Sequence, residues 1–453
     1  MRDSKPGVVV VNSSMPEMDY LAAALHRRAM LRCYVRPYAN RDRWWERALH
    51  RLPGMRAVEQ DTVGRRACGA ALAGATLREA GVVLDFAAAA VRRSGAPEAM
   101  TLSRELLRHR EDAIAAAGAR EVRASDAAVV ANFGVALPAF RVAKRRGGLA
   151  VLNYPIAHHR FAARVLEEEA EREPEFAATL VAQQYPRELE GRMDAECALA
   201  DLILVGSEFV RRSFLREGCA PGKIAVVPYG TDLTRFHPRK ECRDAGRFRI
   251  LFAGQITQRK GISYLLRGYE SIRGADTELL LVGSCGGQER VFAPYRHLFR
   301  HSPPLPRAAM AEIYHSADVL VLPTLLEGLP LVVLEAMACG LPVIATARGA
   351  EQIVRDGIDG FLVPVRDAAA LAAKLELLRR DRELRRHMGA NAARRAAEFG
   401  WESYMHGVGE AIAAQLAARP TWDLESILRG ECCAQGTGVA AFELMSGHDE
   451  RIM

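Results

Sequence analysis

Short, almost continuously apolar runs alternate along this chain with longer segments rich in Ala, Leu and Arg. The apolar runs lack the strict alternation of apolar and polar residues that a half-exposed strand shows, so they are typical of parallel strands buried on both faces. The intervening segments have helical character, and strand–helix–strand crossovers build doubly wound sheets. We therefore predict an α/β protein with strands at 7–11, 127–132, 149–153, 202–205, 224–227, 248–252, 278–282, 319–322 and 342–345.

The domain organisation follows from the length of 453 residues, which suits two or three domains. A polar segment at 238–247 separates one α/β series from a second. We predict two α/β domains at 1–240 and 241–400, a helical segment at 401–420 and a loosely held tail at 421–453.

The composition, with 49% hydrophobic and 26% charged residues, excludes a mainly disordered, fibrous or collagen-like protein. The nine cysteines are scattered, with no CxxC pair, which favours a reduced, cytoplasmic chain without a structural metal. The N-terminal apolar run is too short for a signal peptide. The apolar stretch 328–347 has the length of a membrane span, but Glu335 and two prolines interrupt it, and we predict a buried helix followed by a buried strand.

The net charge of +7 does not by itself call for nucleic acid, and we expect no nucleic-acid partner. Residues 1–150 nevertheless hold 25 Lys+Arg against 15 Asp+Glu. Within them, segment 39–56 combines Trp44 and Trp45 with several arginines. It suits a helix lying on an anionic membrane, and it suits equally a surface helix whose tryptophans enter the core. The basic surplus favours a peripheral contact with an anionic inner membrane, or with a lipid-linked acceptor.

Two carboxylates eight positions apart carry the strongest functional signal, Glu327 after a predicted strand and Glu335 in the helix that follows. Gly328 allows a ligand close to the backbone, and Pro330 suits the first turn of a helix. The amides at that helix start, near Leu331, would attract a diphosphate. Glu335 could then accept hydrogen bonds from a ribose, and Glu327 from a sugar. Carboxylates at this spacing also occur by chance, but the flanking strand and Gly-x-Pro argue against chance here.

A second phosphate-binding candidate lies at 249–269, where a predicted strand ends at Gly254 and a helix opens at Gly261. Arg259 and Lys260 stand in the loop between them, beside the helix start. Only six residues of the chain are lysines, so a lysine inside a motif merits attention. Alone, the loop would fit a solvated basic turn slightly better. The paired carboxylates in the same domain favour the binding interpretation.

With these residues in place, the chain resembles the family-4 retaining glycosyltransferases of the GT-B fold. The segments that carry the resemblance include VPYGTD at 227–232, ADLILVGSEFVRRSF at 200–214 and GAEQIVRDGIDGFLVP at 349–364, beside the Glu-x7-Glu segment. The resemblance implies two Rossmann-like domains facing each other across a cleft. It also implies that the helix opened by Trp401 crosses back to the first domain.

The resemblance also implies roles for individual residues. Lys260, helped by Arg259, would bind the diphosphate of a nucleoside diphosphate sugar, Glu327 would contact the transferred sugar, and Glu335 would hold the ribose. The remaining donor-binding candidates are backbone or neighbouring positions in the two loops: Gly254, Gln255, Gly328, Leu329, Pro330 and Leu331. The family often has Arg where this chain has Gln255, and a glycine pair where it has NSSMPEMDY at 12–20. No metal or other cofactor is expected.

The family usually places a histidine of the first domain near the reacting carbon. His158 and His159 stand where a predicted strand gives way to a helix, and spacing does not decide between them, although we favour His158. Glu-rich residues 167–175 then follow, which we interpret as a solvated helix face and not as a metal site.

The functional prediction is a retaining enzyme that moves a sugar from a nucleoside diphosphate sugar to a hydroxyl of a glycan or lipid-linked acceptor, in bacterial polysaccharide or glycolipid synthesis. Two alternatives stay open: a non-catalytic nucleotide-sugar-binding or assembly partner, and a GT-B sugar-nucleotide epimerase. A dinucleotide-dependent dehydrogenase is disfavoured because no GxGxxG follows an early strand.

Overall fold

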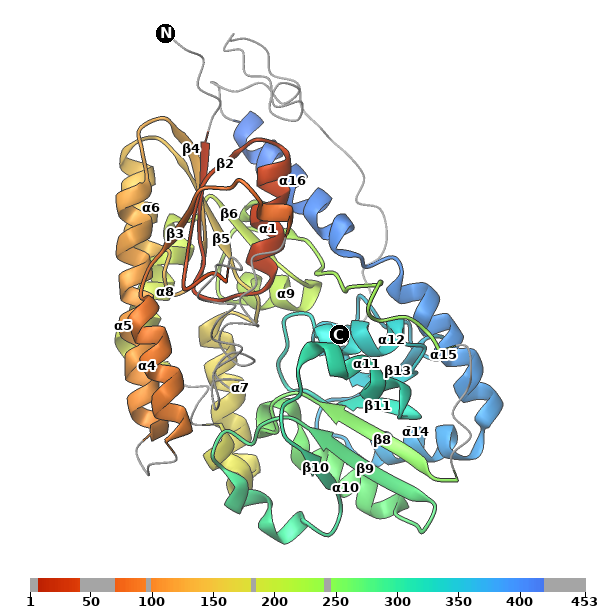
Figure 1. Cartoon of the computed structure of the whole chain (residues 1–453). Helices are drawn as coiled ribbons and strands as arrows, with labels where there is room; N and C mark the ends of the chain where they lie inside the picture. Colours follow the sequence, from red (N-terminus) through yellow and green to blue (C-terminus); the bar gives the residue numbers. More distant parts are fainter. Residues whose placement is uncertain (1–6, 41–69, 95–98, 181–184, 240–245, 419–453) are drawn as a thin grey trace, which may run out of the picture.

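The computed structural model describes residues 7–40, 70–94, 99–180, 185–239 and 246–418 (Figure 1). Two parallel sheets, one in each half of the chain, form two stacked α/β domains. The seven-stranded first sheet has the order β3-β2-β1-β4-β5-β6-β7, and the six-stranded second sheet has the order β10-β9-β8-β11-β12-β13. The predicted fold class is therefore confirmed.

The strands of the first sheet are β1 (Gly7–Val11), β2 (Leu31–Arg36), β3 (Leu77–Glu79), β4 (Asp126–Asn132), β5 (Leu149–Asn153), β6 (Leu202–Val205) and β7 (Ile224–Val226). Those of the second are β8 (Phe248–Ala253), β9 (Thr277–Val282), β10 (Arg300–Ser302), β11 (Val319–Leu322), β12 (Val343–Thr346) and β13 (Gly360–Val363). All nine predicted strands are present, whereas β2, β3, β10 and β13 were not predicted.

The helices of the first domain are α1 (Glu17–Arg27), α4 (Val82–Arg93), α5 (Ala99–Glu121), α6 (Leu137–Arg145), α7 (His159–Arg172), α8 (Arg187–Leu199) and α9 (Glu208–Arg216). Those of the second are α10 (Ile262–Ile272), α11 (Arg307–His315), α12 (Leu331–Ala338), the short α13 (Ala347–Ala350), α14 (Ala368–Arg380) and α15 (Arg382–Ala396). The stretch 328–347 is thus a buried helix and a buried strand, as predicted. No helix in the described ranges is long and apolar enough to cross a membrane.

Strand β1 shows why its sequence is apolar throughout. Val8 and Val10 pack with α1 on one face of the sheet, whereas Val9 and Val11 pack with α5 on the other, and all four are fully buried. A strand covered on both faces has no position for a polar side chain, which is the pattern that the sequence shows.

Helix α16 (Trp401–Ala417) leaves the second domain and returns to the first, where it packs against α1 (Figure 1). Its buried residues Trp401, Tyr404, Val408 and Ile412 recur at helical spacing and form one apolar stripe. The ring of Trp401 stacks on Tyr20 of α1, with ring centroids 3.7 Å apart.

Candidate active site

The loop after β8 carries the two predicted phosphate-binding side chains. Its single helical turn, η7 (Gln258–Lys260), ends at Gly261, which has a φ of 72°. A Cβ on Gly261 would lie 1.9 Å from the carbonyl oxygen of Pro323 at the end of β11. Only glycine combines this φ with so close an approach, so the loop after β8 fits tightly against the loop after β11.

Lys260 and Glu327 meet at this junction, because the side-chain Nζ of Lys260 contacts the Glu327 carboxylate. Arg259 donates from its Nη1 to the Leu326 carbonyl oxygen at 2.8 Å, and the same nitrogen lies 3.5 Å from the Glu327 carboxylate. The side chains of Lys260 and Arg259 are almost fully buried. Burial, together with the Arg259 charge, lowers the pKa of Lys260 well below its usual value. Burial lowers the pKa of Arg259 to about 10. The two cations are thus concentrated where water screens them little.

The loop after β11 leads from Glu327 into α12, and it touches the first domain. The Ser207 hydroxyl, before α9, donates to the Gly328 carbonyl oxygen at 2.5 Å. Leu329 and Pro330 are buried, and no side chain caps the first turn of α12, which starts at Leu331. The amides and positive dipole end of this eight-residue helix lie in the same loop as Glu327.

Glu335 lies one turn inside α12 and is buried. Its Oε1 accepts two hydrogen bonds from Arg307, at 3.0 and 2.7 Å, and its Oε2 accepts one from the Tyr314 hydroxyl at 2.8 Å. A carboxylate has about four lone-pair sites, so one on Oε2 is left for a ligand hydroxyl. Arg307 and Tyr314 were not predicted, because both belong to α11, whose sequence contains no recognisable motif.

The two histidines belong to the start of α7 and point into the packing of the first domain. His158 caps the helix, with its ring accepting from the Arg160 amide at 3.3 Å, and burial lowers its pKa to about 4. His159 uses both ring nitrogens, one with the Tyr154 hydroxyl at 3.1 Å and one with Asp194 at 3.0 Å. A catalytic role for either stays a prediction.

The loop after β1, where the sequence departs from the family pattern, is held by its own side chains. The Asn12 side-chain oxygen accepts from the amides of Ser14 and Met15, at 2.9 and 2.7 Å. Ser14 has a φ of 126°, a conformation that favours glycine, so the loop keeps a glycine-like backbone without a glycine. Glu17 follows at the start of α1, where it accepts a hydrogen bond from Asn153 at 3.0 Å. Burial raises the pKa of Glu17 to about 7.

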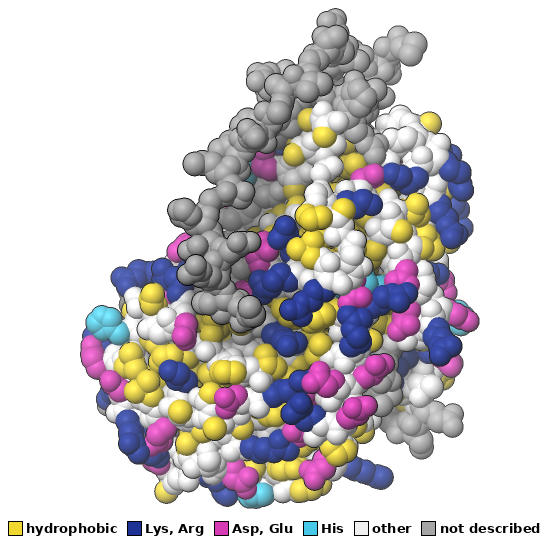
Figure 2. Space-filling model, turned by 180° about the vertical axis from the view of Figure 1, so that it is seen from behind, with side chains coloured by type: hydrophobic (Ala, Val, Ile, Leu, Met, Phe, Trp, Pro, Cys, Tyr) yellow, Lys and Arg dark blue, Asp and Glu magenta, His cyan; other side chains and the backbone are white. Residues whose placement is uncertain are grey.

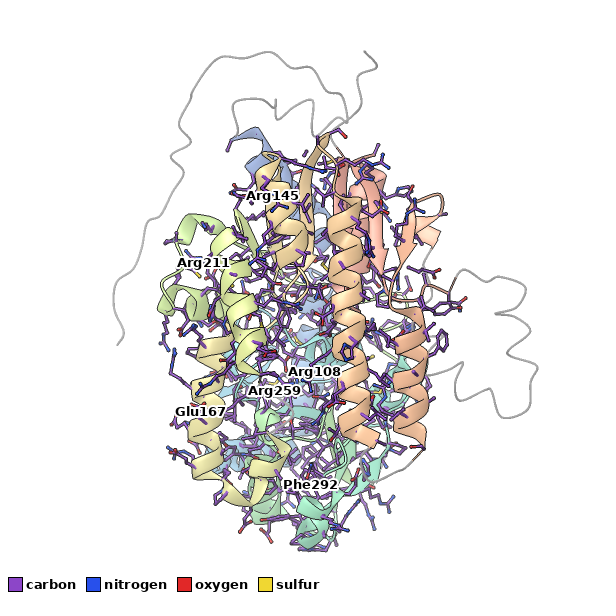
Figure 3. All side chains as sticks on the ribbon, turned by 90° about the vertical axis from the view of Figure 1, so that its left-hand side faces the viewer. Arg108, Arg145, Glu167, Arg211, Arg259 and Phe292 are labelled. Atoms are coloured by element: carbon purple, nitrogen blue, oxygen red, sulfur yellow. The ribbon has the colours of Figure 1, made fainter. Side chains whose placement is uncertain are left out.

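The Glu-rich segment 167–175 is not simply a solvated helix face, which corrects the sequence interpretation. Glu168 is exposed, but Glu169 is fully buried and Glu173 is 5% exposed. Both buried carboxylates contact residues of the second domain. Figure 3 shows α7, with Glu167 labelled, running down beside the region where Arg259 is labelled. No group of three or more His, Cys, Asp or Glu side chains in the described ranges is arranged to hold a metal ion.

Residues 247–381 match the family model described as "Glycosyl transferases group 1". The match covers most of the second domain. It contains all the donor-binding candidates, from Gly254 to Glu335.

Curated proteins similar to this chain include the D-inositol 3-phosphate glycosyltransferases of Arthrobacter sp. strain FB24 and Streptomyces bingchenggensis. The first is 36% identical over 198 aligned residues, and the match covers 40% of this chain and 47% of that protein. The second is 34% identical over 230 aligned residues, and the match covers 45% of this chain and 50% of that protein. The chain therefore spans about half the length of the curated relatives it matches.

Solved structures resemble the whole chain, first domain included. Sucrose-phosphate synthase from Thermosynechococcus elongatus has a TM-score of 0.60 at 22% identity, covering 92% of this chain and all of that one. HepE of Anabaena, solved in complex with UDP and glucose, has a TM-score of 0.60 at 13% identity, covering 91% and 100%. These likenesses show the fold, in which two Rossmann-like domains face each other, the GT-B arrangement.

Proposed function

We propose that this protein is a retaining glycosyltransferase that moves a sugar from a nucleoside diphosphate sugar to a hydroxyl acceptor. The observation that carries the proposal is the meeting of Lys260, Arg259 and Glu327 beside the uncapped start of α12. Two buried cations and a helix N-terminus suit a diphosphate, and a carboxylate between them suits the hydroxyls of the attached sugar.

The chemistry that such a site supplies is stabilisation of the leaving group. When the bond from sugar to diphosphate breaks, negative charge builds on the phosphate oxygens. Lys260, Arg259 and the α12 amides would stabilise that charge from fixed positions, which is the largest single contribution in many enzymes. The ion pair between Lys260 and Glu327 would have to open as the Lys260 ammonium pairs with the diphosphate instead.

The position of Glu335 supports a place for the ribose of the donor. Arg307 and Tyr314 fix the orientation of its carboxylate and leave a lone pair on Oε2. A ribose hydroxyl could donate to that oxygen without displacing either partner. Orientation by fixed neighbours is what makes one hydrogen bond selective.

The acceptor, on this proposal, is a glycan or lipid-linked hydroxyl in bacterial polysaccharide or glycolipid synthesis. The Trp- and Arg-containing segment 39–56 lies almost wholly outside the described residues, so the peripheral membrane contact stays a prediction, as does the cytoplasmic location. Figure 2 shows Lys and Arg side chains interspersed with Asp and Glu on the face that it displays.

A thermal-shift screen with UDP-, GDP- and ADP-sugars tests donor binding, because a ligand of the native state raises its melting temperature. We expect one class to stabilise the wild type, and Lys260→Ala to abolish most of that shift. Transfer or donor hydrolysis by the pure protein should fall about 100-fold or more in Lys260→Ala and in Glu327→Ala.

Lys144→Ala is the matched control, since Lys144 pairs with Asp201 in the first domain. It should bind and react like the wild type. Full activity of Lys260→Ala would contradict the proposal, and stabilisation without any transfer or hydrolysis would favour a non-catalytic binder.

A further inference from the structure

The carboxylate of Glu169 lies between the domains and is fully buried. It belongs to α7 of the first domain, but its three hydrogen-bond donors belong to the second. Oε1 accepts from the Gln258 side-chain amide at 2.6 Å and from the Tyr264 hydroxyl at 2.8 Å, and Oε2 accepts from the Arg366 Nε at 2.7 Å. A buried carboxylate with charge-assisted partners makes strong, well-defined hydrogen bonds.

One of these donors belongs to the phosphate-binding loop itself. Gln258 begins η7, the turn that contains Arg259 and Lys260. The backbone amide of Gln258 also donates to the Thr179 hydroxyl of the first domain, at 2.9 Å. The first domain thus holds this turn at both the side chain and the backbone of Gln258.

Gln258 also has hydrogen-bond partners within its own domain. Gln258 is also bonded to Ser263, through the Ser263 amide at 3.1 Å and its hydroxyl at 2.7 Å. If the domains separated, the side chain would keep these local partners but lose Glu169, and the Gln258 amide would lose Thr179. The turn would then be held only by contacts within the second domain, such as those of Arg259 with the loop after β11.

We propose that Glu169 is a positioning residue that couples closure of the two domains to the order of the loop carrying Lys260. When the domains close, Glu169 binds Gln258 and fixes η7, so Lys260 is held where a diphosphate can bind. When they open, the same carboxylate becomes hydrated and the turn gains freedom. Donor affinity and domain closure then strengthen each other, because each stabilises the same state. The diphosphate part of this inference rests on the proposed function, whereas the coupling of Glu169 to the loop does not.

The chain offers two close controls for a Glu169 variant. Glu168 pairs with the same Arg366, at 2.7 Å, but has no contact with Gln258. Glu173 makes a separate interdomain ion pair, with both its carboxylate oxygens 2.6 Å from Arg267 nitrogens. Glu168→Ala therefore reports the loss of an Arg366 partner, and Glu173→Ala reports the loss of an interdomain ion pair, both with the Gln258 contact intact.

Amide hydrogen exchange of residues 256–263 in the ligand-free protein is the first test. We expect exchange roughly tenfold faster in Glu169→Ala than in the wild type. Glu168→Ala and Glu173→Ala should leave it near the wild-type rate, and Glu169→Gln, which keeps an acceptor for Gln258, should lie between. Unchanged exchange in Glu169→Ala, or an equal rise in Glu173→Ala, would overturn the coupling.

Donor binding is the second test, measured by calorimetry with whichever of UDP, GDP or ADP stabilises the wild type most. Glu169→Ala should raise the Kd roughly 30-fold. Adding Gln258→Ala to that variant should raise the Kd little further, because both substitutions remove the same interaction. Fully additive losses would contradict the pairing. A protein that binds none of the three, yet shows the faster exchange, would refute the proposed donor class and keep the coupling.

Discussion

At the scale of single residues, the loops after β8 and β11 hold opposite charges in direct contact. Lys260 and Glu327 are both largely buried, and the Nε of Arg259 is buried without a hydrogen-bond partner among the described residues. Buried charges need partners, because removing one partner leaves the other uncompensated. A bound diphosphate would give both cations a partner of opposite charge and release Glu327 toward the sugar.

Glu17 gives a residue-scale prediction about pH. The carboxyl has a folded pKa of about 7 against 4.5 in the unfolded chain, so the folded state binds the extra proton between these values. The free energy of unfolding should therefore fall as pH rises from about 4.5 to 7, by roughly 3 kcal/mol from this group, and level off above. The Asp19 carboxylate and the hydroxyls of Tyr229 and Tyr404 lie near the Glu17 carboxyl and interact with it electrostatically.

Urea unfolding of the wild type and Glu17→Gln across this pH range measures that contribution as a difference. The difference is needed because burial also raises the pKa of Glu196 to about 7. Titration of Glu196 therefore changes the free energy of unfolding of the wild type in the same direction as titration of Glu17. Parallel stability curves for the two proteins would show that Glu17 titrates normally.

At the scale of elements, the loop from β11 to α12 approaches the loop from β5 to α7 without room for a side chain. A Cβ on Gly328 would lie 1.6 Å from the carbonyl oxygen of Pro155. Gly328 has no positive φ, so an alanine there is compatible with the fold of its own domain. The obstacle exists only between the domains.

Gly328→Ala should consequently hold the domains apart while leaving each folded. We expect circular dichroism close to the wild type, a larger radius of gyration in small-angle X-ray scattering, and transfer reduced at least tenfold. Gly357→Ala is the control, because its Cβ would have open space, although its φ of 74° adds local strain. An unchanged radius with normal transfer would show that the loops yield without opening the cleft.

Elements differ in how far the sequence predicts them, for physical reasons. Central strands such as β4 and β5 are apolar except at their ends, and this nearly continuous apolar pattern identifies them. Edge strands β3 and β10 have three residues each, with charged side chains, and a pattern so short resembles a loop. The burial of Glu169 was not predicted, because its partner Arg366 is 197 residues away in the sequence. A local sequence pattern carries no information about so distant a contact. The carboxylate pair and Lys260 stand out in the sequence because both loops have local glycine signals.

At the scale of the whole molecule, α16 fastens the end of the second domain to the first. Trp401 is 7% exposed, and beside its stack on Tyr20 it packs edge-to-face against Tyr404, with centroids 5.6 Å apart. Trp401→Ala should lower the free energy of unfolding by roughly 3–5 kcal/mol, the usual cost of a buried large-to-small change.

Chemical denaturation followed by circular dichroism measures this loss. Glu402→Ala is its neighbour and control, since the exposed Arg27–Glu402 pair should contribute less than about 1 kcal/mol. Equal midpoints for Trp401→Ala and the wild type would mean that the α16 docking contributes little to stability.

The chain passes between the domains twice, and the two passages touch. The Thr231 amide donates to the Phe399 carbonyl oxygen at 2.8 Å, and a Cβ on Gly230 would lie 2.4 Å from the Trp401 nitrogen. In topological terms the second domain is an insertion in the first, bounded by two adjacent junctions near residues 231 and 400. A chimera that exchanges donor specificity with a relative should therefore be spliced at both junctions together, because a single fusion point would leave α16 paired with a foreign α1.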